Sequence, residues 1–280
     1  MAMLRQASFF YFLALFMAAC GLFAGGSMAQ MSHMLSGDVL KTGQNISNPL
    51  YTLVMQADCN LALYRSPSVF VWSTGTNGKG SGCELWLKTD GNLVINDKDE
   101  KLIWQTGTNG TVGHYVLLLQ RDRNLVIYSV PAWDSGTGTR PKLKIKYSNI
   151  EASASSTGVS TAPTNQLLPG DILKTGQKIS NANYTLLMQP DCNLVLYGSS
   201  SQAIWYTHTN DKGSECELRL QTDGNLAIHD KDGKLIWQTA TNGTIGNYVL
   251  LMQRDHNVVL YGKPIWDSGT GSVRVPPTTY

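Results

Sequence analysis

The chain has 280 residues, of which 42% are hydrophobic and only 15% are charged, and its formal net charge is +2. This length is enough for two domains of ordinary size. A sparse and nearly balanced charge gives no electrostatic footprint for nucleic acid. Aromatic residues are more informative, because the seven Trp and twelve Tyr can supply buried area or flat faces for a ligand.

Residues 1–29 have the features of a secretory signal peptide. Arg5 gives a positive start, residues 9–17 form an apolar run, and mostly small residues lead to a cleavage position after Ala29. A membrane anchor is the alternative, but the uninterrupted apolar run is short for a span. We therefore expect the mature chain to enter the secretory pathway, to reach an extracellular or vacuolar destination, and not to insert into a membrane.

Two homologous blocks follow, at residues 30–138 and 165–273, and a tail occupies residues 274–280. Their opening phrases, which begin at Leu35 and Leu168, match almost residue for residue. The stretch between them, 139–164, begins with basic residues and continues as a Ser/Thr/Ala-rich segment. Such a composition buries little surface and is typical of a flexible linker. Its basic part is either a site of proteolytic processing or a solvated tether.

Four cysteines remain once the signal peptide is removed. Each block holds one pair, and the spacing within the pair is the same in both blocks, so the repeat predicts the disulfides Cys59–Cys83 and Cys192–Cys216. Loops of this size contribute about 3–4 kcal/mol each in the chain-entropy model. Metal binding is the competing interpretation, but the chain has neither a Cys-x-x-Cys motif nor a nearby His pair. We expect no metal.

The secretory context also makes four sequons candidate N-glycosylation sites. They are Asn45, Asn109, Asn183 and Asn242.

The local sequence is that of short strands joined by tight turns. Residues 51–56 and 61–64 have strand composition, and residues 57–60 between them have turn chemistry. The next copy places Asp90-Gly91 at the tip, which is a strong hairpin signal. No window sustains helical periodicity over twelve residues, so we predict an all-β fold.

One nine-residue pattern, Gln-x-Asp-x-Asn-x-Val-x-Tyr, recurs six times. Its aspartates follow one another at a fixed interval within a block, and a second constant interval relates each copy to its counterpart in the other block. Three copies are complete: Gln120, Asp122, Asn124, Val126 and Tyr128; Gln189, Asp191, Asn193, Val195 and Tyr197; Gln253, Asp255, Asn257, Val259 and Tyr261. Three are altered: Gln56, Asp58, Asn60 and Tyr64 with Ala62 for Val; Gln221, Asp223 and Asn225 with Ala227 and His229; Asp90, Asn92 and Val94 with Lys88 and Asn96.

The pattern suits a sugar if the chain turns at Asp-x-Asn. On a straight strand the Gln and the Tyr would lie roughly 26 Å apart, whereas a turn brings all the polar groups together. Amide, carboxylate and phenol groups then match the adjacent hydroxyls of a sugar, and Val offers an apolar floor. The alternative is structural, because Asp and Asn in turns often bond their own backbone. Gln and Tyr are not needed for a turn, which favours a ligand.

One Trp follows each hairpin, and these residues recur at the same interval that relates the two blocks. We expect three sheets per block around a central axis, with the Trp residues filling the core; ligand stacking is the alternative. The six are Trp72, Trp104, Trp133, Trp205, Trp237 and Trp266. A seventh, Trp86, has Arg219 as its counterpart, and we predict that it is exposed.

These motifs resemble those of the monocot bulb-type mannose-binding lectins, the snowdrop-lectin-like family, in its two-domain form. The resemblance covers both blocks. It implies two tandem copies of the type II β-prism, each with three four-stranded antiparallel sheets and pseudo-threefold symmetry. It also implies that Asp and Asn bind the 2-hydroxyl of mannose, Gln the 3-hydroxyl and Tyr the 4-hydroxyl, while Val packs on the ring.

The resemblance implies a function as well: non-catalytic, multivalent recognition of terminal α-mannose on glycans, in plant defence or storage, without a cofactor. The three complete copies are the expected sites. The Gln56 copy is weakened by its smaller floor, the Gln221 copy is doubtful, and the Lys88 copy is expected to be silent.

Two other functions remain as alternatives. One is a sugar-blind, protein-binding or taste-modifying member of the same fold. The other is an enzyme, which is disfavoured because glycosidases need two carboxylates at a defined separation and the motif aspartates belong to different repeats.

The family also forms oligomers by exchange of C-terminal strands. The segments around 131–133 and 264–266 are the candidates for that exchange, either between chains or between the two domains of one chain.

Overall fold

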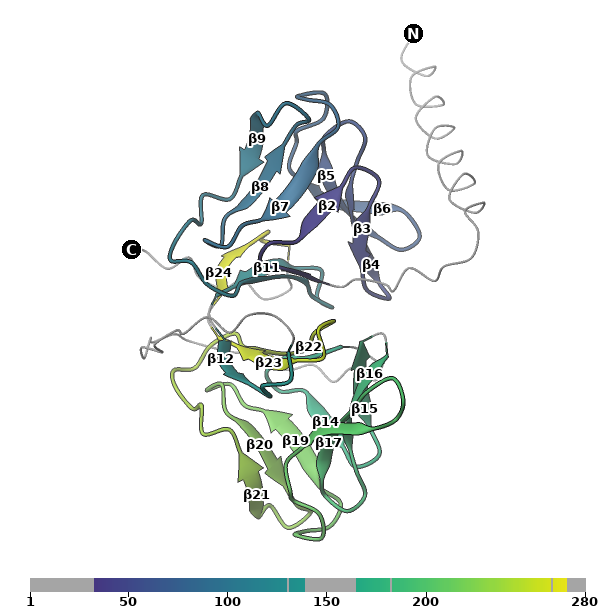
Figure 1. The fold of residues 1–280 in the computed structure, drawn as a ribbon, viewed down its shortest axis with the longest axis vertical. Helices are drawn as coiled ribbons and strands as arrows, with labels where there is room; N and C mark the ends of the chain where they lie inside the picture. The colour runs from purple at the N-terminus through teal and green to yellow at the C-terminus, as the bar shows by residue number, and fades with distance from the viewer. Residues whose placement is uncertain (1–32, 130, 139–164, 182, 263, 271–280) are drawn as a thin grey trace.

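A computed structural model describes residues 33–129, 131–138, 165–181, 183–262 and 264–270 (Figure 1). The predicted signal peptide, linker and tail lie outside these residues. The regular structure of the described residues consists of strands, which confirms the all-β prediction. The strands form six four-stranded antiparallel sheets in two sets of three, the β-prism arrangement that the resemblance implied.

The first prism contains three sheets, and the strands of each follow in spatial order. They are β3 (Asn45–Ser47), β4 (Tyr51–Met55), β5 (Leu61–Arg65) and β6 (Val69–Ser73); β2 (Val39–Lys41), β7 (Glu84–Leu87), β8 (Leu93–Asn96) and β9 (Leu102–Gln105); and β1 (His33–Leu35), β10 (Val116–Leu119), β11 (Leu125–Tyr128) and β24 (Pro264–Asp267).

The second prism repeats this plan. Its sheets are β15 (Lys178–Asn181), β16 (Tyr184–Met188), β17 (Leu194–Tyr197) and β18 (Ala203–Tyr206); β14 (Ile172–Lys174), β19 (Glu217–Leu220), β20 (Leu226–His229) and β21 (Leu235–Gln238); and β12 (Pro131–Asp134), β23 (Val258–Tyr261), β22 (Val249–Met252) and β13 (Gln166–Leu167).

The two prisms exchange their last strands. Strand β24, from the end of the second block, pairs with β11 in the first prism, and β12, from the first block, pairs with β23 in the second. Figure 1 shows yellow β24 against the teal strands of one prism and teal β12 against the yellow strands of the other. Of the two expected kinds of exchange, the structure therefore shows the one within a single chain.

Strand alternation directs one face of each sheet to a prism core. In β11, Leu125 and Ile127 belong to the core of the first prism, while Val126 and Tyr128 point to the opposite face. The two cores are built mainly from Leu, Ile and Met side chains. Each also contains one disulfide, and the pairs are those predicted, Cys59–Cys83 and Cys192–Cys216.

The Trp residues form two trios that cross the sequence blocks. Trp266 packs edge-to-face on Trp72 and Trp104, with ring centroids 6.3 and 6.2 Å apart. Trp133 likewise packs on Trp205 and Trp237, at 5.7 and 6.1 Å. All six Trp residues pack against the prism cores, as expected, but they lie on outer strands and stay partly exposed, so they border each core and do not fill its centre. Strand exchange supplies one member of each trio from the other block.

The third sheets of the two prisms pack against each other through their outer faces. Strands β10 and β22 are apolar at every position, as expected for strands that are buried on both faces. The apolar contact surface consists of Leu35, Val116, Leu118, Val126, Tyr128, Val249, Leu251, Val259 and Tyr261. We call this cluster the interprism interface.

Two ion pairs flank the interprism interface and are related by pseudo-twofold symmetry. Arg121 of the first prism binds Asp171 of the second, and Arg254 of the second binds Asp38 of the first at 2.6 Å. Members of the two pairs are displaced along the chain by the same interval that relates the blocks. The symmetry of the repeat is therefore also the symmetry of the interface.

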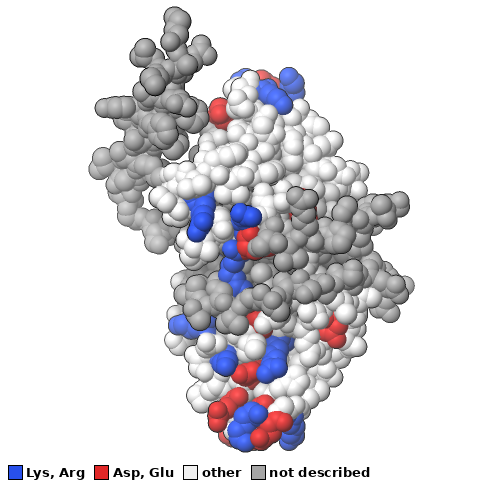
Figure 2. All heavy atoms as spheres, turned by 180° about the vertical axis from the view of Figure 1, so that it is seen from behind, with Lys and Arg blue, Asp and Glu red and all other residues white. Residues whose placement is uncertain are grey.

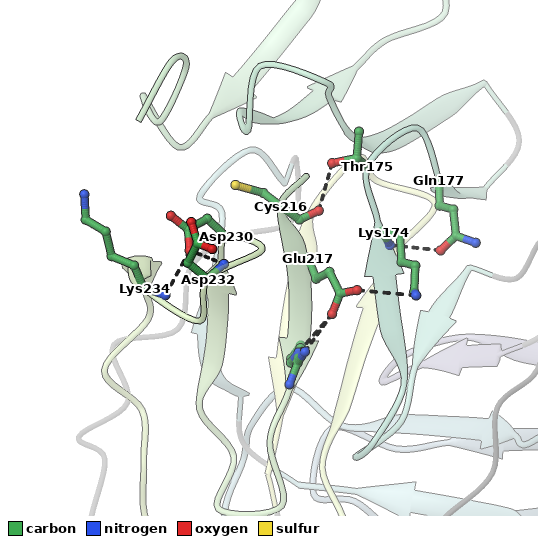
Figure 3. Close-up of polar contacts among 9 residues, drawn as sticks. Lys174, Thr175, Gln177, Cys216, Glu217, Asp230, Asp232 and Lys234 are labelled. Carbon is green, nitrogen blue, oxygen red and sulfur yellow. Dashed lines mark hydrogen bonds and ion pairs between the residues drawn. The ribbon is translucent and has the colours of Figure 1, made fainter. Parts of the chain in front are cut away.

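The second sheets differ between the prisms. Trp86 in β7 is 39% exposed, which confirms its predicted exposure. Its counterpart Arg219 bonds Glu217, whose carboxylate also pairs with Lys174 at 3.4 Å (Figure 3). These bonds hold the pKa of Glu217 below its usual value, with the Arg219 hydrogen bond as the largest cause.

Charged side chains are few on the face shown in Figure 2, where Lys and Arg alternate with Asp and Glu rather than forming a basic patch. All four sequon asparagines are exposed. Within the described part of the chain, no helix has the length and apolar content that crossing a bilayer requires. No cluster of three or more His, Cys, Asp or Glu suited to a metal ion occurs among the described residues.

Candidate functional site

Each nine-residue motif spans the hairpin between the two central strands of a sheet. In the second prism, Gln189 follows β16, while Val195 and Tyr197 lie in β17. The turn between them is closed by a backbone bond from Cys192 N–H to Gln189 O, with Cys192 at a φ of 71°. Because the chain reverses, Gln189 Nε2 reaches Tyr197 and donates a hydrogen bond to its hydroxyl at 2.6 Å. The predicted convergence is confirmed.

The same Gln-to-Tyr hydrogen bond occurs wherever the motif keeps both residues. The bonds are Gln56–Tyr64 at 3.0 Å, Gln120–Tyr128 at 2.6 Å and Gln253–Tyr261 at 2.5 Å. We name the six sites by their first residue. The Gln221 and Lys88 sites have His229 and Asn96 at the Tyr position, so neither can form this pair.

The motif aspartate has a structural role in all six copies. Asp191 Oδ1 accepts the backbone N–H of Asn193 at 3.0 Å, and the other five aspartates make the same bond. The structural alternative raised for the motif is thus present in the fold. Since one oxygen holds the turn, the second carboxylate oxygen is the one that can accept from a ligand.

The motif asparagine is fixed by a segment that the sequence interpretation missed. Asn193 Oδ1 accepts hydrogen bonds from Thr207 Oγ1 at 3.1 Å and from Thr209 N–H at 3.2 Å. The two hydroxyls are themselves 2.7 Å apart. This arrangement leaves Asn193 Nδ2 as the donor available to a ligand. A Ser/Thr-x-Thr sequence shortly after each hairpin Trp was the signal for it, and it recurs with the motif.

The second-repeat sites use their asparagine internally. Asn92 Nδ2 donates to Gln105 Oε1 at 2.9 Å, and Asn225 Nδ2 donates to Gln238 Oε1 at 2.8 Å. Each glutamine lies directly opposite the floor residue of its site. The amide that would meet a ligand is therefore engaged by a neighbouring strand.

The two third-repeat sites lie in the interprism interface. Tyr128 and Tyr261 are 0% and 1% exposed, and Gln120 and Gln253 are nearly as buried. Burial raises the pKa of the Tyr128 phenol above its usual range. Burial is also the largest cause of the raised pKa of Asp122, and the nearby Asp267 carboxylate adds to it. These two complete motifs are thus covered by the other half of the molecule.

The first-repeat sites remain partly open. In the Gln189 site, the Gln, Asp and Tyr side chains are all partly exposed, and Val195 forms a buried floor. In the Gln56 site, Asp58 is exposed, and Gln56 and Tyr64 are partly exposed over the smaller floor of Ala62. The structure therefore leaves one complete and one slightly altered motif facing solvent.

Comparison with known proteins places the chain among lectins, although no family model matches it. "Mannose-specific lectin 1" of Colocasia esculenta is 33% identical over 188 residues, 67% of this chain and 64% of that protein, so the match spans just under two thirds of that relative. "Mannose-specific lectin 1" of Crocus vernus is 31% identical over 197 residues, 69% of each chain.

A solved structure shows the same two-prism architecture. The fetuin-binding agglutinin of Scilla campanulata, a two-domain lectin, aligns with a TM-score of 0.69 and 29% identity, over 85% of this chain and all of its own. Lectins bind carbohydrate without catalysis, so these relatives support the expectation that the protein is not an enzyme. The sequence relatives and the shared architecture together show that the chain belongs to the monocot mannose-binding lectin family.

Proposed function

We propose that the protein is a mannose-binding lectin that recognises terminal α-mannose on glycans, and that the Gln189 and Gln56 sites carry this activity. One observation carries the proposal: the Gln189 site keeps the complete motif with its Gln, Asp and Tyr side chains accessible. The relatives named mannose-specific provide independent support.

The hydrogen bonds inside the site define what each group offers a sugar. Asp191 retains one free carboxylate oxygen to accept, and Asn193 retains Nδ2 to donate. This pair of adjacent groups suits the axial 2-hydroxyl, which both donates and accepts. Gln189 and Tyr197, already joined to each other, meet the 3- and 4-hydroxyls, and Val195 packs on the ring carbons.

The other four sites do not bind mannose in this proposal. The Gln120 and Gln253 sites are closed by the interprism interface, since neither tyrosine hydroxyl is accessible. The Gln221 and Lys88 sites lack the Gln–Tyr pair and direct their asparagine amide to a neighbouring glutamine.

Weak single sites and multivalency follow from this geometry. A shallow site with a few hydrogen bonds binds one sugar at about millimolar strength, close to 4 kcal/mol. Two sites on one rigid molecule, multiplied by association of several chains, raise apparent affinity on a mannose-dense surface by roughly 10²–10⁴-fold. We place the protein in the secretory pathway, outside the cell or in the vacuole, where its four exposed sequons would be accessible to glycosylation.

Retention on immobilised mannan tests the proposal. The protein should be retained and should elute with methyl α-mannoside but not with the glucoside, which differs at carbon 2. Asp191→Ala should weaken retention, whereas Asp223→Ala removes the same turn bond in the Gln221 site and should not. Equal retention of both variants would contradict the assignment. Failure of the unaltered protein to bind would favour a sugar-blind, protein-binding member of the fold.

A further inference from the structure

The Gln189 site has an aromatic side chain opposite its floor residue, a position that is small or polar in the other five sites. Tyr206 in β18 lies directly opposite Val195, the floor of the site. Residues opposite each other in an antiparallel pair project from the same face with Cβ atoms about 5 Å apart, so Tyr206 stands beside the floor. The equivalent residues of the other sites are small or polar: Ser73, Gln105, Asp134, Gln238 and Asp267.

Tyr206 is exposed and is supported by a second ring. Its side chain is 43% exposed. The imidazole of His208, also exposed, lies with its centroid 4.3 Å from the Tyr206 ring at an interplanar angle of 58°. Thr207 between them is buried and bonds Asn193. The two rings are therefore fixed by the same segment that orients a residue of the site.

His208 occupies a backbone position that favours glycine. Its φ is 58°, in the left-handed region that is unfavourable for residues with a Cβ. The fifth of the five equivalent positions is Ala240, and the other four are glycines with positive φ: Gly75, Gly107, Gly136 and Gly269. A side chain kept at a strained position beside a binding site points to a use for that side chain.

We propose that Tyr206 and His208 form a platform for a second sugar residue, linked to the mannose held by the Gln189 site. This inference rests on the proposed function and specifies its ligand, an α-linked mannose oligosaccharide rather than a single sugar. The apolar C–H face of the second sugar packs on the Tyr206 ring, and the imidazole nitrogens bond its hydroxyls. The Gln56 site has Ser73 and Gly75 at these positions and lacks this platform; its own aromatic neighbour, Phe70, lies opposite Tyr64 instead of opposite the floor.

Calorimetric titration with methyl α-mannoside and with α-linked mannobioses tests mannose binding at the Gln189 site separately from the platform for a second sugar. The protein should carry Gln56→Ala and Tyr64→Phe, which leave the turn bonds of Asp58 intact and make the heat report the Gln189 site. The best mannobiose should bind roughly 3- to 10-fold more tightly than the monosaccharide, the range expected for one added aromatic contact. Absence of monosaccharide binding would overturn the proposed function, whereas equal affinity for both ligands would overturn only the platform.

The first prism supplies a matched variant that keeps the fold. Tyr206→Ser with His208→Gly installs the residues found in the Gln56 site, on the same backbone conformation. The ratio of mannobiose to monosaccharide affinity should fall to near one, and the Tm should not drop because the strained φ is relieved. The reciprocal change, Ser73→Tyr with Gly75→His in otherwise unaltered sites, should raise mannobiose affinity at the Gln56 site. An unchanged ratio in the first variant would overturn the platform.

Discussion

Replacement of Trp266 by Ala should destabilise the first prism, although Trp266 belongs to the second block. Its ring packs on Trp72 and Trp104 at 6.3 and 6.2 Å, in the edge-to-face geometry that adds about 0.5–1.5 kcal/mol per pair. Fully buried Trp→Ala changes cost about 3–5 kcal/mol, and the partial exposure of Trp266 lowers the expected loss to about 2–3 kcal/mol.

Hydrogen exchange followed by mass spectrometry shows which prism loses stability in the Trp266 variant. Amides of β4 and β5 that exchange through opening of the first prism should exchange roughly 30- to 150-fold faster, since each 1.4 kcal/mol is a factor of ten. Amides of β16 and β17 should change much less. Trp133→Ala is the matched control and should show the reverse pattern. Faster exchange confined to the second prism in the Trp266 variant would refute the strand exchange.

Three further predictions concern the interface and the linker. Arg121→Ala should lower the free energy of unfolding by about 2–3 kcal/mol, because it leaves the largely buried Asp171 carboxylate without its partner; adding Asp171→Ala should recover part of the loss in thermal unfolding. Burial raises the pKa of Asp122 above 3.8, so its folded state binds the proton more tightly than the unfolded chain. The stability it contributes is complete below pH 3.8 and is lost as pH rises through the folded pKa. Asp122→Asn should remove this contribution to the pH dependence of the free energy of unfolding. Urea titrations at several pH values that give the same pH dependence for both proteins would contradict it. Cleavage between residues 139 and 164 should leave both fragments in one gel-filtration peak, because β12 and β24 are each built into the other prism; separation without denaturant would count against the exchange.

Much of the fold could be predicted because each repeat carries the same local physics. The turn chemistry and the strand pattern recur in all six hairpins, and the cysteine spacing recurs in both blocks. The interpretation of one hairpin therefore applies to the other five. The partner of each C-terminal strand could not be predicted in this way. Trp133 and Trp266 follow the same local sequence, and local sequence does not say which prism receives a strand.

The candidate site was predictable in composition but not in accessibility. The Gln120 and Gln253 motifs match the pattern as completely as the Gln189 motif does, yet their tyrosines are buried. The strand before each motif differs at one outward-facing position: β10 and β22 have Val116 and Val249, which belong to the interprism interface, where β16 has Thr185. The uninterrupted apolar run of β10 and β22 was visible in the sequence and indicated burial on both faces.

Calorimetric titration of the unaltered mature protein with methyl α-mannoside, with the glucoside as control, tests the central claim most directly. We predict millimolar binding of the mannoside alone, at two sites per chain, with one site lost in Asp191→Ala. Binding of both sugars, no binding of either, or a mannoside titration that Asp191→Ala leaves unchanged would contradict the account.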